Sequence, residues 1–136
     1  YFDAKNNPIM RKGGYASFTY EYNEIRRVIR ETYFDTQGNS VVQDAGYASL
    51  KRQFDAIGHV IREDYFDEQG LPVLYSNGIA SINREYNERW QLIREWYLDT
   101  EGSPVNNTSG VASIERIYDD WKMTEEIKRD KDGNIV

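Results

Sequence analysis

Cysteine is absent from the 136 residues, and histidine occurs only once. Without thiols the chain forms neither a disulfide framework nor a thiolate metal site. Nucleophilic catalysis of the Ser-His or Cys-His type needs a histidine base, and the Cys-His type also needs a thiol; the chain has one histidine and no cysteine. The sequence therefore predicts a protein that is not an enzyme and that uses no metal or other cofactor.

Basic residues and long apolar runs are also scarce. The chain has 17 lysines and arginines against 23 aspartates and glutamates, which gives a net charge of −6. Nucleic-acid backbones are bound by clustered basic residues, so this balance argues against a nucleic-acid partner. No apolar run approaches the roughly 20 residues of a transmembrane helix, so we expect no membrane span.

Aromatic residues, in contrast, are abundant. They make up 14% of the chain, as 11 tyrosines, 5 phenylalanines and 3 tryptophans. Tyrosine packs its ring against neighbours and keeps its hydroxyl in water, and it is enriched in β-strands. Together with a mean hydropathy of −0.80, this composition favours strands whose faces are half exposed to solvent.

The clearest feature is an internal repeat of 32 residues. The hexapeptide YFDTQG at Tyr33 has close copies that begin at Tyr1, Tyr65 and Tyr97. A period that holds four times indicates a repeat architecture. We expect a single repeat domain with units 1–32, 33–64, 65–96 and 97–128 and a C-terminal stub, 129–136. Because the chain starts inside a unit, we also expect it to be a segment of a longer protein.

Within each unit the residue pattern predicts a β-hairpin. The segment ASFTYEY alternates large aromatic with small or polar residues, which is the period of a strand. We expect one strand at Ala16–Tyr22 and a second at Arg27–Asp35, with Asn23 opening the turn between them. Gly58 supplies a left-handed turn position in the second unit, and the other units have Arg26, Trp90 and Lys122 at that place.

The YFDTQG stretch is expected to join one hairpin to the next. Asp35 starts a turn, and the position three residues later is a glycine or an asparagine in all four units, which predicts a positive φ there. A lone hairpin is only marginally stable in water, so the units must pack on one another. The predicted fold is therefore all-β, with four tandem hairpin units stacked into an elongated twisted sheet or a β-solenoid.

The two ends of this array differ. In the fourth unit, the charged segment TEEIKRDKD replaces the VIREDYF of the second, which is typical of a capping strand that discourages edge pairing. The N-terminal end has no such cap. We therefore expect that end-to-end self-association through the N-terminal edge is possible.

The segment 14–39 resembles the RHS/YD repeat of bacterial proteins. The matching residues are Gly14, Tyr20, Tyr22, Asn23, Asp35 and Gly38. The YFD-x-x-G turn also resembles the choline- and glucan-binding repeats of Gram-positive surface proteins, and similar units occur in arrays beside cell-envelope transferase domains in Firmicutes. These resemblances imply a non-catalytic array at a bacterial cell surface or outside the cell.

Charged residues offer three alternatives to a purely structural array. His59 lies in a predicted turn, where a solvated residue is favoured over a catalytic base. Glu31 and its equivalents, Glu63 and Glu95, each follow an arginine; they favour a ladder of cross-strand ion pairs over a glycosidase-like carboxylate pair. The DKDGN segment at Asp130 resembles the start of a calcium loop, although an ordinary aspartate-initiated turn is favoured.

The three tryptophans, Trp90, Trp96 and Trp121, break the symmetry of the repeat, because all of them fall in its last two units. Flat aromatic rings beside hydrogen-bonding groups are common in sugar-binding sites, so these three residues, with Tyr86 and Tyr118, are the candidate ligand-binding set. The favoured alternative is that they seal the end of the stack or belong to its core. We expect a module that binds a glycan, a cell-wall polymer or another protein; the alternative is an RHS-like structural spacer or shell segment with no ligand.

Overall fold

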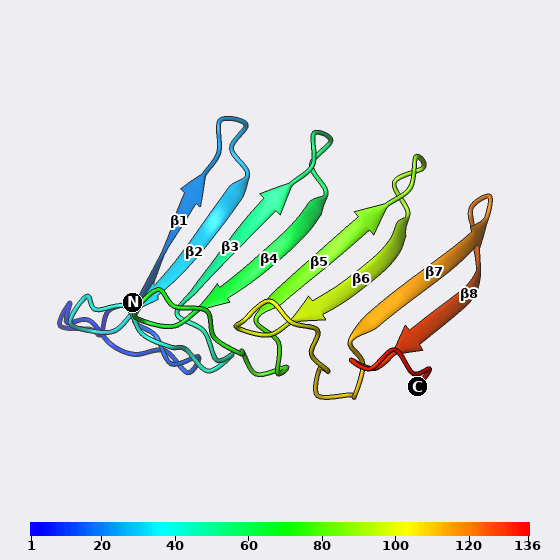
Figure 1. Cartoon of the computed structure of the whole chain (residues 1–136). Coiled ribbons are helices and arrows are strands. Elements are labelled where there is room, and N and C mark those ends of the chain that lie inside the picture. Colours follow the sequence, from blue (N-terminus) through cyan, green and yellow to red (C-terminus); the bar gives the residue numbers. More distant parts are fainter.

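The computed structural model describes residues 1–136 and contains eight β-strands in one open antiparallel sheet (Figure 1). The all-β prediction is confirmed, and the sheet is open. The strands follow one another in chain order across the sheet: β1 (Ser17–Tyr22), β2 (Val28–Phe34), β3 (Ser49–Phe54), β4 (Val60–Phe66), β5 (Ser81–Tyr86), β6 (Leu92–Leu98), β7 (Ser113–Asp119) and β8 (Lys122–Arg129). The structure contains no helix of the length and apolarity that a membrane span requires.

The strands form four hairpins, and pairing is more extensive within a hairpin than between hairpins. The predicted first and second strands, Ala16–Tyr22 and Arg27–Asp35, lie within one residue of β1 and β2. Inside that hairpin the register runs from Ser17↔Phe34 to Tyr22↔Val28. Between hairpins only three residue pairs align, at the middle of one strand and the start of the next. Neighbouring hairpins are therefore unpaired toward their tips, and side chains must bridge them there.

The hairpin turns depend on residues with positive φ. Arg26, Gly58 and Trp90 have φ values of 63°, 108° and 63°, as expected for this turn position. In the fourth hairpin the prediction of Lys122 is wrong, because Asp120 takes the left-handed conformation, with φ 52°, and Lys122 begins β8. This hairpin closes through the short turn Asp120–Trp121, and aspartate tolerates that conformation better than most residues.

The joints between hairpins are the predicted aspartate turns. Asp35 Oδ1 accepts hydrogen bonds from the backbone N–H groups of Gln37 and Asn39, at 2.8 and 3.0 Å. The predicted positive φ is confirmed at all four positions: Asn6, Gly38, Gly70 and Gly102 have φ values of 66°, 81°, 79° and 81°. Asp130 makes the same turn, with Oδ1 accepting from Asp132 and Asn134 N–H at 2.9 Å each.

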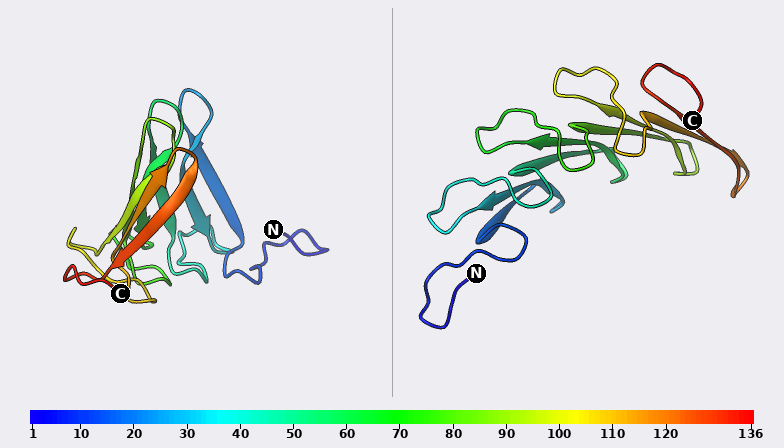
Figure 2. Two further views of the ribbon diagram at one scale, coloured as in Figure 1. Left: turned by 90° about the vertical axis from the view of Figure 1, so that its right-hand side faces the viewer. Right: turned by 90° about the horizontal axis from the view of Figure 1, so that it is seen from below.

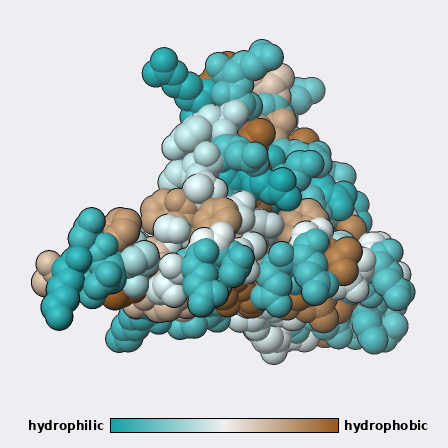
Figure 3. Space-filling view, turned by 90° about the vertical axis from the view of Figure 1, so that its left-hand side faces the viewer, coloured by the Kyte–Doolittle hydropathy of each residue, from teal (hydrophilic) through white to brown (hydrophobic).

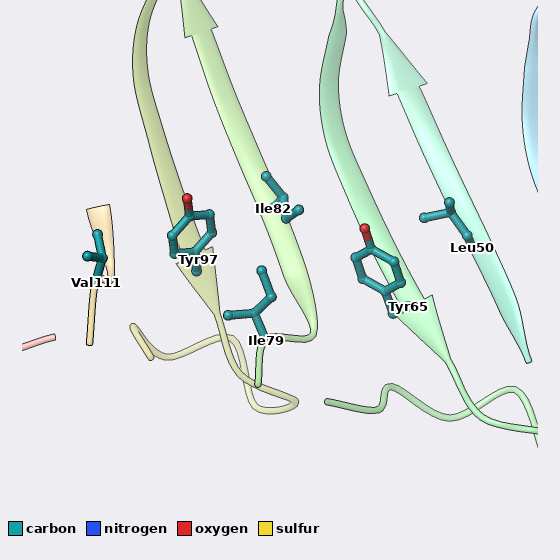
Figure 4. Packing of buried hydrophobic residues seen from close by; sticks show 6 residues of the cluster. All are labelled: Leu50, Tyr65, Ile79, Ile82, Tyr97 and Val111. Atoms are coloured by element: carbon teal, nitrogen blue, oxygen red, sulfur yellow. The ribbon is translucent and has the colours of Figure 1, made fainter. Parts of the chain in front are cut away.

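The joints and the loops that follow them lie at one end of the sheet, and the hairpin tips lie at the other (Figures 1 and 2). The hydrophobic core is near the loop end, where six buried side chains pack together (Figure 4): Leu50, Tyr65, Ile79, Ile82, Tyr97 and Val111. Seen from the β1 side, hydrophobic residues also gather at the loop end, with mostly hydrophilic ones toward the tips (Figure 3). Only 13 of the 136 residues are buried, so the hydrophobic core is small.

Candidate functional site

A ladder of ion pairs crosses one face of the sheet from β2 to β6. Arg52 Nη1 lies 2.9 Å from Glu31 Oε1, and Arg52 Nε lies 3.5 Å from Glu63 Oε1. Arg84 continues the ladder, with 3.4 Å from its Nη1 to Glu63 Oε1 and 2.9 Å from its Nε to Glu95 Oε2. The cross-strand pairing expected for the three glutamates is therefore present.

A tyrosine two residues further along the strand supports each glutamate of the ladder. The hydroxyls of Tyr33, Tyr65 and Tyr97 donate to Glu31, Glu63 and Glu95, at 3.1, 2.9 and 2.6 Å. Burial, together with these adjacent carboxylates, raises the pKa of all three tyrosines well above the usual phenol value. The glutamates are thus held by an arginine on one side and a phenol on the other.

The arginines that precede these glutamates face the other side of the sheet. Arg62 pairs with Asp64 of its own strand, with 2.9 Å between Nε and Oδ2, and not with a neighbouring strand as expected. Arg30 and Arg94 lie 3.9 and 4.0 Å from glutamates of the adjacent strand. Pairs this long and this exposed contribute little to stability.

The ladder stops between β6 and β7. Arg116 has the position of Arg84 in the fourth hairpin, but it pairs with Glu126 of β8, at 2.9 Å, and makes no ion pair with Glu95. A shallow cavity of about 460 Å³ lies beside this break. The lining residues, which define the β6–β7 cleft, are Glu85, Asn87, Ile93, Arg94, Glu115, Arg116, Ile117 and Tyr118.

Trp90 and Trp121 lie on the tips of the two hairpins that border this cleft. They are 59% and 74% exposed, which makes Trp121 the more exposed of the two. Arg89 connects the tips, because its Nη1 lies 2.7 Å from Asp120 Oδ1 and its guanidinium lies 5.2 Å from the Trp121 ring centre. Gln91 adds a hydrogen bond of 3.0 Å to the Asp120 carbonyl. The two tryptophans therefore sit on neighbouring, cross-linked turns.

Tyr86 and Tyr118 connect each hairpin to the one before it. The Tyr86 hydroxyl donates to the carbonyl of Val60 at 3.2 Å, and the Tyr118 hydroxyl donates to that of Leu92 at 2.9 Å. Because these hydroxyls are already engaged, the two tyrosines fix the position of the tips.

His59 belongs to the same inter-hairpin contacts. Its ring stacks on Tyr86, with 4.6 Å between ring centres, and its Nδ1 lies 3.0 Å from Asp55 Oδ2. Desolvation acts to raise the pKa of Asp55, but hydrogen bonds from the His59 and Gly58 N–H groups and the His59 ring outweigh it and lower this pKa to about 2. The Trp90 ring lies 6.3 Å away from the imidazole, so His59 is placed to support this tip.

Trp96 does not join the other two tryptophans. It lies within β6, paired with Asn83 on β5 and Ser113 on β7, and neighbouring strand residues point to opposite faces. It is therefore on the face opposite the Glu95 carboxylate. The Arg94 guanidinium lies 4.5 Å from the centre of its ring, so one face of Trp96 is occupied by a cation.

No pattern of residues directly indicates the β6–β7 cleft. The cleft depends on whether Arg116 contacts Glu95 or Glu126. These two glutamates lie on different strands, β6 and β8. The one visible sign was that the fourth unit departs from the repeat after Tyr118, where the turn shortens and Lys128 takes the place of the supporting tyrosine.

Compared with protein-family models and with curated protein sequences, the chain gives no match to either. Two exposed indole rings lie on the tips of the hairpins that border a shallow cleft, and the cleft presents carboxylate, amide and guanidinium groups. Such a surface suits a ligand that stacks on aromatic rings and exchanges hydrogen bonds at its rim.

Proposed function

We propose that the chain is a non-enzymatic module of a bacterial surface or envelope protein, built from four tandem hairpin units, that binds a glycan or a cell-wall polymer. One hydrogen bond supports the four-unit description because it recurs with the repeat. The N–H groups of Ala16, Ala48 and Ala80 donate to the carbonyls of residues 34, 66 and 98, and that of Ala112 donates to residue 129. The last partner comes one residue early, where the fourth unit is shortened.

The observation that carries the binding proposal is the pair of exposed tips beside the cleft. Trp90 and Trp121 expose large apolar rings in a chain where other aromatic residues of the second to fourth hairpins are mostly half-buried or buried. Sugar rings stack on such surfaces through their C–H faces, and their hydroxyls need partners at the edge. The carboxylates of Glu85 and Glu115 in the β6–β7 cleft offer those partners.

The test is binding to polymers before and after removal of the two rings. The double variant Trp90→Ala/Trp121→Ala should lose binding to the purified cell-wall polysaccharide or peptidoglycan that the native chain retains in a sedimentation assay. Ile25→Ala/Ile57→Ala is a matched control, because these residues are exposed apolar groups on the first two tips. Equal retention by the tryptophan variant and the native chain would overturn the proposal, as would no retention by the native chain on any polymer.

A structural spacer is the second candidate, and the side-chain hydrogen bonds and ion pairs between hairpins favour it. Arg27 reaches across to the carbonyls of Ile57 and Gly58 on the next tip, at 3.5 and 3.3 Å. Together with the ion-pair ladder, such hydrogen bonds between hairpins stiffen the sheet along its length. If the native chain binds no polymer but small-angle scattering gives one extended shape that salt does not alter, the spacer function is favoured.

A further inference from the structure

The loop end of the sheet has two notches that occupy the same place in units 64 residues apart. Six of the positions that line the first are Phe2, Pro8, Ser17, Asp35, Thr36 and Gly38. The corresponding lining residues of the second are Phe66, Pro72, Ser81, Asp99, Thr100 and Gly102. The cavities measure about 170 and 90 Å³, respectively. Neither notch includes a residue of the β6–β7 cleft, so they form a separate feature.

Each notch has one apolar wall and one polar wall. In the second notch Phe66 and Pro72, which are bridged to each other, form the apolar wall. Asp99 and Thr100 form the polar wall, where Asp99 Oδ1 accepts the N–H groups of Glu101 and Ser103 at 2.9 Å each. Oδ2 of Asp99 makes no such turn contact, so this oxygen can accept a hydrogen bond from a ligand.

The charges of the notches exclude an anion as the favoured ligand. Arg62 is the only lysine or arginine that lines either notch, and Asp64 neutralises it with contacts of 2.9 to 3.1 Å. The remaining charged groups are carboxylates at turns, which accept hydrogen bonds. A ligand with an apolar face and several hydroxyl donors matches both walls. We propose that each notch binds one sugar residue of a neutral saccharide chain.

The joint between the two notches provides an internal comparison. Ser40 stands where the notches have Pro8 and Pro72, and Glu68 stands where they have Thr36 and Thr100. Its backbone is the same, since Phe34 bridges to Ser40 as Phe66 bridges to Pro72. This joint therefore lacks the proline wall and has a charged side chain in place of a hydroxyl, and it binds sugar more weakly.

The spacing of the notches allows one saccharide chain to occupy both of them at once. They lie four strands apart in the sheet, which is about 19 Å at the usual strand separation. When an oligosaccharide is long enough to span both notches, binding in the first notch holds it close to the second. Its overall affinity therefore rises, by about tenfold or more. A single sugar residue does not gain in this way.

Amide resonances of the joint glycines test this proposal site by site. Glucose, N-acetylglucosamine and their 1,4-linked hexamers are titrated into the ¹⁵N-labelled chain, with choline and glucuronate as charged comparators. A neutral sugar should shift the Gly38 and Gly102 amides and leave Gly70, at the middle joint, in place. The hexamer should bind at least tenfold more tightly than the monomer. No shift at Gly38 and Gly102, or equal shifts at all three glycines, would overturn the proposal.

Two exchanges of residues between joints sharpen the test. Pro72→Ser/Thr100→Glu gives the second notch the residues of the middle joint, so Gly102 should cease to respond while Gly38 still shifts. Ser40→Pro/Glu68→Thr should make Gly70 respond as a third site. Tighter binding of choline or glucuronate than of any neutral sugar would overturn the ligand class. Shifts confined to the Trp90 and Trp121 indoles would overturn the notches and leave the cleft proposal intact.

Discussion

The Nε atom of Arg116 lies 2.9 Å from Oε2 of Glu126, within the fourth hairpin. Arg84, at the equivalent place one hairpin earlier, contacts a glutamate of its own hairpin and one of the hairpin before it. The ion-pair ladder therefore joins the first three hairpins and leaves the fourth outside it. The β6–β7 cleft and the two exposed tryptophans lie at this break, where the fourth hairpin is held to the third by the Arg89, Gln91 and Tyr118 contacts and not by the ladder.

Arg84 should be the most sensitive member of the ladder. Replacing it with methionine leaves Glu63 and Glu95 without their shared partner, and both side chains are less than one fifth exposed. Glu63 keeps Arg52, but Glu95 loses its basic partner; because an unpaired and partly buried carboxylate is costly, we expect a loss of about 2 kcal/mol in unfolding free energy. Arg116→Met removes one more exposed pair and should cost less than about 1 kcal/mol. Urea unfolding followed by circular dichroism measures both, and equal losses would contradict the ladder as described.

The tyrosines that link neighbouring hairpins offer a second test. Tyr118→Phe removes only the hydroxyl that donates to Leu92, and it should lower the unfolding free energy by about 1 kcal/mol. Tyr22 has the same position on β1, where no preceding strand faces it, so Tyr22→Phe should change stability by less than about 0.5 kcal/mol. The comparison is made by chemical unfolding of the two variants. A larger effect at Tyr22 than at Tyr118 would show that the Leu92 contact does not link the hairpins.

Arg26 is a turn residue that the fold holds in an unfavourable conformation. Its φ of 63° is left-handed, and glycine adopts this region without the steric cost of a side chain. Arg26→Gly should therefore raise the unfolding free energy by up to about 1 kcal/mol. Glu24→Gly, two residues away and also exposed, has no such strain to relieve and should be neutral or destabilising. Thermal melts of the two variants measure the difference, and a loss of stability in Arg26→Gly would refute the prediction.

The tyrosines that support the ladder predict a weakness at alkaline pH. Burial and the adjacent glutamates raise the pKa of Tyr33, Tyr65 and Tyr97 in the folded chain, whereas an unfolded tyrosine ionises near pH 10. Above that pH the unfolded chain releases protons that the folded chain keeps. This contribution to stability is therefore complete below about pH 10 and is lost progressively above it.

Absorbance at 295 nm checks this prediction directly. At pH 11 to 12 the exposed tyrosines should ionise at once, and these three only as the chain unfolds. Replacing Tyr65 with phenylalanine should remove one slow ionisation and leave the fast ones unchanged. If all eleven tyrosines ionise in a single fast step while the sheet remains folded, the hydroxyls are not engaged as described.

The local features of the fold could be predicted because they depend on nearby residues. Alternation of apolar and polar residues located β1 and β2 to within one residue, and the Asp35 turn with Gly38 followed from the conformational preferences of those two residue types. The one wrong turn residue, Lys122, came from assuming that the fourth unit keeps the spacing of the others. The shorter turn at Asp120 moved the left-handed position.

The order of amino acids is enough to specify β-hairpins with aspartate turns between them, because strand alternation and turn chemistry act over a few residues. The three-dimensional structure alone specifies that the sheet is open, that Trp90 and Trp121 lie on neighbouring tips, and that Trp96 faces away from Glu95. It also decided where the ladder breaks and where the notches form. Each of these relationships joins residues on different strands or in different units, and their proximity depends on the register between hairpins, which no local pattern of residues specifies.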